Sequence, residues 1–91
     1  MSLTIDAINK AIDISKRYGV VKLILFGSAL ENPAAANDID LACEGITGWK
    51  FFELSSKLEE ELNIPVDLIP LDDSKFSKHI NRIGKVLYEQ S

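Results

Sequence analysis

Five residues have side chains and spacings suited to binding a phosphate group and a divalent cation. Gly27-Ser28 follows a short apolar run, Asp38 and Asp40 flank one isoleucine, and Asp67 interrupts another apolar segment. A glycine lets a ligand approach the backbone closely, and a serine hydroxyl can donate to a phosphate oxygen. Hard cations such as Mg²⁺ favour carboxylate oxygens and keep positions free for substrate phosphates. Together these residues predict a phosphate-binding turn that faces three carboxylates.

The spacing of Asp38 and Asp40 is informative because successive side chains of a strand point to opposite faces. Two residues apart on a strand, both carboxylates project from one face, while Ile39 points to the other. The two charges then repel each other unless a cation lies between them. The alternative is that Asp38 ends a loop and Asp40 is a solvent-facing strand residue.

The other two signals are weaker when each is taken alone. A strand that ends in Gly27-Ser28 is also common turn punctuation. Asp67 within Val66–Ile69 is costly in an apolar strand unless it is exposed, paired or bound to metal. Exposure on an edge strand is therefore the alternative for Asp67.

The hydrophobic pattern predicts alternating helices and strands that would position these residues. We expect helices at about residues 5–18 and 49–62, a short helical turn after Ser28, and strands at 20–26, 38–43 and 64–70. Thr4 is the expected N-cap of the first helix, and Gly19 follows its end.

A last helix is expected after a cap at Asp73 or Ser74, and Gly84 lies within it as a mild weakener. Its apolar face is predicted to consist of Phe76, Ile80, Ile83 and Leu87.

The predicted order is α-β-(short α)-β-α-β-α, which defines an α/β (α+β) fold. Helices pack against a small sheet of three to four strands. About ten residues connect the first two strands, and a parallel crossover usually needs a dozen or more. We therefore expect those strands to be antiparallel and the sheet to be mixed.

Length and composition limit the classes of function that fit. The 91 residues predict one domain, 1–91, and the excess of 14 acidic over 10 basic residues argues against direct binding of nucleic acid. A single cysteine, Cys43, excludes an intramolecular disulfide and fits the cytoplasm. No apolar run is long enough to span a membrane, and the first residues do not resemble a secretory signal.

With these motifs in place, the sequence resembles the minimal nucleotidyltransferases (MNT) of the superfamily that includes DNA polymerase beta. The resemblance covers nearly the whole chain. The matching segments are Leu25–Leu30 for the Gly-Ser motif, Asn37–Ala42 for the paired aspartates, Val66–Ile69 for the third aspartate, and Ile80–Tyr88 for the closing helix.

The resemblance implies a nucleotidyltransferase fold and an activity. Asp38, Asp40 and Asp67 would be the catalytic, metal-binding residues, holding two Mg²⁺ ions, and Asp67 would also help to deprotonate the acceptor hydroxyl. Gly27 and Ser28 would bind the nucleotide phosphates. Members of this family occur beside HEPN-domain toxins, so the implied reaction is transfer of AMP from ATP to a toxin tyrosine by an antitoxin.

Other functions remain open. One domain leaves little room for an acceptor pocket, so the acceptor is expected to come from a partner protein or from a second subunit of the same chain. Many relatives carry arginines directly after the Gly-Ser motif, where this sequence has Ala29, Leu30 and Glu31. Lys22 and Lys50 are candidates for the missing positive charge.

The missing arginines favour a module that neutralises its partner by binding alone. Transfer to a small molecule is a weaker alternative.

Overall fold

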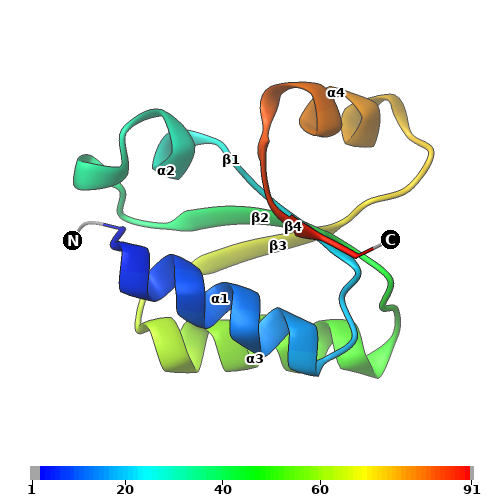
Figure 1. Cartoon of the computed structure of the whole chain (residues 1–91), viewed down its shortest axis with the longest axis horizontal. Coiled ribbons are helices and arrows are strands. Elements are labelled where there is room, and N and C mark those ends of the chain that lie inside the picture. Colours follow the sequence, from blue (N-terminus) through cyan, green and yellow to red (C-terminus); the bar gives the residue numbers. More distant parts are fainter. Residues whose placement is uncertain (1–2, 91) are drawn as a thin grey trace.

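A computed structural model of the chain describes residues 3–90 and shows four helices, a short 3-10 turn and four strands (Figure 1). In chain order they are α1 (Ile5–Arg17), β1 (Lys22–Phe26), α2 (Ser28–Glu31), η1 (Pro33–Ala35), β2 (Ile39–Glu44), α3 (Trp49–Leu62), β3 (Val66–Pro70), α4 (Lys75–Ile83) and β4 (Lys85–Glu89). The predicted α/β class is confirmed.

The four strands form one mixed sheet in the order β3-β2-β1-β4. Strand β1 pairs with β2 antiparallel and with β4 antiparallel, while β2 and β3 run parallel. The expected antiparallel pairing of the first two strands is therefore correct. Strand β3 lies at an edge of the sheet.

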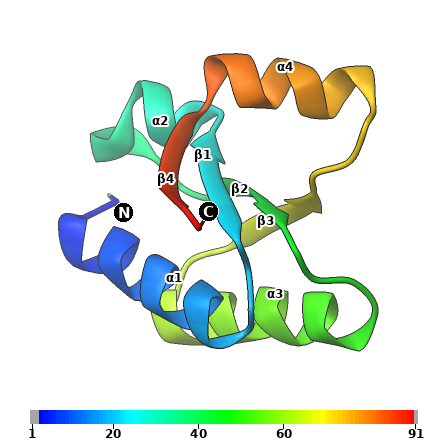
Figure 2. The same ribbon diagram turned by 45° about the vertical axis from the view of Figure 1, so that its right-hand side comes forward.

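The two faces of the sheet are covered differently, as a rotated view shows most clearly (Figure 2). Helices α1 and α3 pack together under one face, where a large apolar core includes Leu23, Leu41 and Leu58. On the other face, Ile80 of α4 packs on Ile24 and Ala42 in a much smaller cluster. This second face keeps polar side chains accessible beside α4.

The start and end of α1 follow the predicted signals. The Thr4 side chain accepts a hydrogen bond of 3.1 Å from the Ala7 amide, and the chain turns at Gly19 with φ of 92°. The helix ends at Arg17, one residue earlier than expected. Ile5 is 76% exposed, and the buried residues of α1 are Ala11, Ile14 and Ser15.

The prediction of one long final helix is wrong. Helix α4 ends at Ile83, and Leu87 lies on the edge strand β4, where the chain pairs with β1. Gly84 is extended (φ −78°, ψ 168°), and a Cβ there would collide with the Ile24 side chain. Gly84 therefore allows close packing at a helix-to-strand junction and does not weaken a helix.

The predicted apolar face of this last segment is also only partly correct. Ile80 is buried, but Phe76 and Ile83 are 55% and 50% exposed. Across residues 3–90, none of the helices is long and apolar enough to cross a membrane.

Candidate active site

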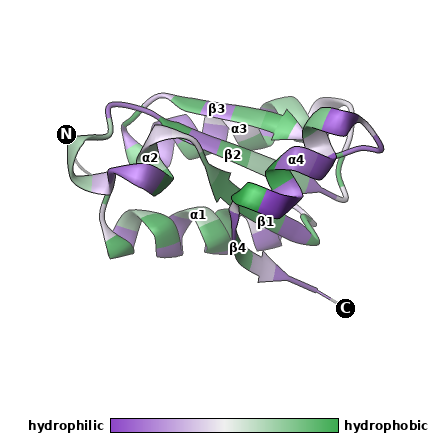
Figure 3. Ribbon diagram, turned by 90° about the horizontal axis from the view of Figure 1, so that it is seen from above, coloured by the Kyte–Doolittle hydropathy of each residue, from purple (hydrophilic) through white to green (hydrophobic). Residues whose placement is uncertain are grey.

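The five predicted residues gather where β1 ends and β2 begins, on the sheet face that carries α4. Gly27 and Ser28 lie at the junction of β1 and α2, and Asp38 immediately precedes β2. Asp40 is the register partner of Asp67 on the neighbouring strand. Hydrophilic colour interrupts both β2 and β3 in Figure 3.

Asp40 lies at the centre of this group of residues. It is half-buried and is flanked in register by Phe26 on β1 and Asp67 on β3. Burial raises the pKa of its carboxyl group, and the negative charges of Asp38 and Asp67 raise that pKa further. Asp38 and Asp67 are therefore close enough to Asp40 to disfavour its negative charge, and a bound cation would relieve that repulsion.

Gly27 is required at its position by both its backbone and its neighbour. Its φ of 76° and ψ of −155° lie in a region that only glycine adopts readily. A Cβ atom at this position would collide with the Asp40 carboxylate and lie 3.1 Å from its Cγ. The turn and the central carboxylate therefore touch, because no side chain separates them.

The donor set fits a hard cation by its chemistry, although the acids do not form a ready-made cage. Within residues 3–90, no three acidic, histidine or cysteine side chains converge closely enough to hold a metal ion. Asp38 and Asp67 are exposed, and Asp38 lies in the loop before β2, as one of the two sequence interpretations had it. Both of these side chains are therefore accessible to a metal–nucleotide complex from solvent.

The residues after the Gly-Ser turn have different environments. Ser28 is exposed, while Ala29 is fully buried in the main core. Glu31 ends α2 with an exposed side chain. Ala29 thus occupies a packing position here and is not open to a ligand.

The two lysines considered as sources of positive charge lie elsewhere. Lys22 begins β1, four residues before Phe26 and so about 13 Å along the strand, and its Nζ is 3.6 Å from the Glu89 carboxylate. Lys50 belongs to the first turn of α3, a helix that packs under the opposite face of the sheet. Neither lysine lies beside the three aspartates.

One pair of residues at this site was missed by the sequence analysis. Phe26 is the register partner of Asp40, and its ring meets that of Phe76 from α4 edge-on, with centroids 6.4 Å apart. The apolar periodicity had placed Phe76 on a buried face. Since the position of α4 over the sheet decides this contact, no local sequence signal could have revealed it.

Comparison with known proteins assigns the family. Residues 9–91 match the sequence profile described as polymerase beta, nucleotidyltransferase, so the chain belongs to that family. No curated protein matches the chain significantly.

Several solved structures are similar to the chain, and they include toxin-antitoxin complexes. One is a toxin-antitoxin structure with AMP-PNP, at 26% identity and a TM-score of 0.76, covering 92% of this chain and 74% of that one. Another is a tri-AMPylated Shewanella oneidensis HEPN toxin in complex with its MNT antitoxin, at 25% identity and 0.72, covering 92% and 71%. The MntA–HepT toxin-antitoxin structure supports the fold. It has 23% sequence identity and a TM-score of 0.74, and the match covers 96% of this chain and 74% of that one.

Proposed function

We propose that this chain is a Mg²⁺-dependent nucleotidyltransferase that transfers AMP from ATP to a tyrosine hydroxyl of a HEPN-domain toxin and thereby acts as its antitoxin. The observation that carries the proposal is the contact of the Gly27 turn with Asp40, which lies in register with Asp67. A phosphate-binding turn and carboxylates are thus adjacent on three strands. The similar structures with AMP-PNP and with an AMPylated toxin support the nucleotide and the acceptor.

Asp38, Asp40 and Asp67 are the residues that would hold the metal ions. Bound Mg²⁺ would supply charge neutralisation at the triphosphate and polarise the reacting phosphoryl group. Burial, and after it the charges of Asp38 and Asp67, raise the pKa of Asp40, and a nearby cation would stabilise the carboxylate against both effects.

The remaining roles follow from position. Gly27 lets the turn lie directly against the Asp40 carboxylate, and the exposed Ser28 hydroxyl can donate to the β- and γ-phosphates. The acceptor oxygen forms a bond to the α-phosphorus, the bond from that phosphorus to pyrophosphate breaks, and the acceptor proton goes to Asp67. The exposed edge position of Asp67 leaves its carboxylate accessible to an acceptor from another protein.

The partner is proposed to be a basic HEPN-domain protein encoded nearby, and the complex to act in the cytoplasm. The net charge of −4 suits a basic partner better than it suits RNA. The buried free thiol of Cys43 fits a reducing compartment.

A second candidate function is neutralisation by binding alone. The buried Ala29 and the exposed acidic Glu31 favour it, because neither can contribute positive charge to a triphosphate. The two functions make different predictions for variants that lack the aspartates.

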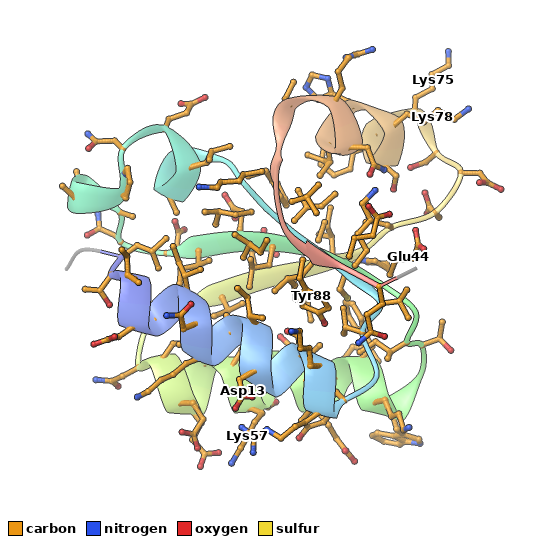
Figure 4. All side chains as sticks on the ribbon, in the orientation of Figure 1. Asp13, Glu44, Lys57, Lys75, Lys78 and Tyr88 are labelled. Atoms are coloured by element: carbon orange, nitrogen blue, oxygen red, sulfur yellow. The ribbon has the colours of Figure 1, made fainter. Side chains whose placement is uncertain are left out.

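The test incubates the full chain with ATP, Mg²⁺ and the HEPN protein, followed by mass spectrometry of that protein. We expect a gain of AMP with the wild type, none with Asp38→Asn/Asp40→Asn, and an unchanged gain with Asp13→Asn, whose side chain lies on α1 away from the site (Figure 4). A gain that persists in the double variant contradicts the catalytic assignment. Full neutralisation of the toxin without any gain establishes the binding-only function instead.

A further inference from the structure

A half-exposed aromatic ring lies next to the proposed nucleotide site without a role in the mechanism above. Phe76, on the first turn of α4, is 55% exposed, although its helix packs on the sheet through the buried Ile80. Single exposed apolar side chains are common on protein surfaces, so the relevant observation is the place of this ring beside the turn and the carboxylates. It is therefore a candidate for contact with a ligand.

The position of Phe76 relative to the turn and the carboxylates is fixed by contacts. Its ring meets Phe26 at a centroid distance of 6.4 Å and an interplanar angle of 83°. Phe26 immediately precedes Gly27 and is the register partner of Asp40. Phe76 is thus one side chain away from both the phosphate-binding turn and the central carboxylate.

Phe76 remains 55% exposed despite its contact with Phe26. Phe26 supplies the ring that holds Phe76 in place, while Ile69 and Leu71 contribute further apolar surface on this side of the sheet. Lys75 and Lys78 point from α4 away from the sheet (Figure 4), so they do not occupy this position. A flat, uncharged group would find an aromatic surface here.

From this arrangement we infer that Phe76 forms the base-binding subsite, stacking on the purine of the nucleotide whose phosphates contact Gly27 and Ser28. This inference rests on the proposed function, and it names the part of the site that recognises the base. A purine bears a flat π-surface, and stacking on an aromatic side chain does not depend on the hydrogen-bonding edge of the base. The subsite therefore favours purine over pyrimidine nucleotides by area and discriminates little between ATP and GTP.

The test compares two probes that share the phosphates and differ in the base. Binding of ATP and of inorganic tripolyphosphate, both with Mg²⁺, is measured by titration calorimetry on the wild type and on Phe76→Ala and Phe76→Trp. We expect Phe76→Ala to weaken ATP about tenfold and to leave tripolyphosphate unchanged, while Phe76→Trp binds ATP at least as tightly as the wild type. Ile83→Ala, which removes another exposed apolar side chain of α4, should change neither affinity.

The outcomes separate this inference from the proposed function. If the wild type binds ATP with Mg²⁺ and Phe76→Ala binds it equally well, the subsite is wrong and the proposed function stands. Equal loss of ATP and tripolyphosphate also overturns the subsite, because the ring then supports the fold of the whole site. If Phe76→Ala keeps its affinity for ATP but has a raised KM for the acceptor protein, the ring belongs to the binding site of the acceptor and the base subsite is wrong. If the wild type binds no ATP with Mg²⁺, the proposed function fails, and the subsite fails with it.

Discussion

The two faces of the four-stranded sheet are built from alternate residues of the same strands, yet they do different work. On β2, Ile39 and Leu41 are buried in the large core under α1 and α3, while Asp40 between them faces the side of α4. One face has few polar groups and supplies most of the buried apolar area. The other face keeps charged groups close together, which costs stability, and it is the face with the chemistry of a site.

The largest expected effect on folding comes from the apolar face. Leu58→Ala removes a fully buried side chain of α3, and we expect the free energy of unfolding to fall by about 2–5 kcal/mol. The matched change on the other face, Asp67→Asn, should alter it by about 0.5 kcal/mol or less, because Asp67 is exposed. Urea denaturation measures both. Equal losses would show that the two faces are not divided in this way.

Two glycines on the side of α4 separate the packing of that face from its proposed site. Gly84→Ala forces a Cβ against the Ile24 side chain and within 2.8 Å of the Ile80 carbonyl oxygen, so we expect a loss of about 1–3 kcal/mol in stability. ATP affinity per folded molecule should be retained. Gly27→Ala is expected to lower the free energy of unfolding by about 1–3 kcal/mol as well, through backbone strain. In addition, it should displace Asp40 and abolish binding of ATP with Mg²⁺.

Thermal denaturation and ATP titration on both glycine variants separate these effects. Retained ATP binding in Gly27→Ala would contradict the role of the turn. Lost binding in a folded Gly84→Ala would show that the helix-to-strand junction also shapes the site.

The Asp40 carboxyl group should also affect how the stability of the protein depends on pH. Because the pKa of Asp40 is raised in the folded state, the folded protein binds its proton at a higher pH than the unfolded chain does. Stability should therefore rise as pH falls through that raised pKa, and the gain should be complete below the ordinary value of 3.8. Asp40→Asn should remove this part of the pH profile and be at least as stable as the wild type near pH 7.

Denaturation measured at several pH values, with Asp13→Asn as the control, tests this prediction. A profile that is identical in the wild type and in Asp40→Asn would mean that Asp40 does not carry the repulsion. Mg²⁺ should raise the Tm of the wild type more than that of Asp40→Asn at neutral pH.

The smallest effect is expected on the outer surface of α3. Trp49 and Phe52 are 83% and 65% exposed and line an open hollow of about 390 Å³ on the side of the molecule away from the carboxylates. Trp49→Ala should change the free energy of unfolding by about 0.5 kcal/mol or less and leave ATP binding intact. Denaturation and calorimetry check both expectations, and a loss of ATP affinity would connect this surface to the site.

The parts of this protein that the sequence predicted well are those governed by local pattern. Alternation around Asp40, the cap at Thr4 and the short connection before Ile39 each act over a few residues, and each was predicted close to where it occurs. The family profile and the similar structures agree with the fold that those motifs indicated.

The end of the chain could not be predicted in the same way. Ile80, Ile83 and Leu87 have helical spacing, but β4 is stabilised by pairing with β1 and by the 2.7 Å hydrogen bond from the Tyr88 hydroxyl to the Val20 carbonyl. These partners lie 60 or more residues away in sequence. The same long-range packing places Phe76 beside Phe26, which is why the aromatic part of the site escaped local analysis.

The most direct test of the central claim is to follow the two ends of the triphosphate separately. The full chain is incubated with Mg²⁺, its HEPN partner, and ATP labelled with ³²P at either the α- or the γ-phosphate. Nucleotidyl transfer at the carboxylate face predicts that the partner acquires label from α-labelled ATP only, and that Asp40→Asn abolishes it. Label from the γ-phosphate, or label from the α-phosphate that survives in Asp40→Asn, would contradict this account.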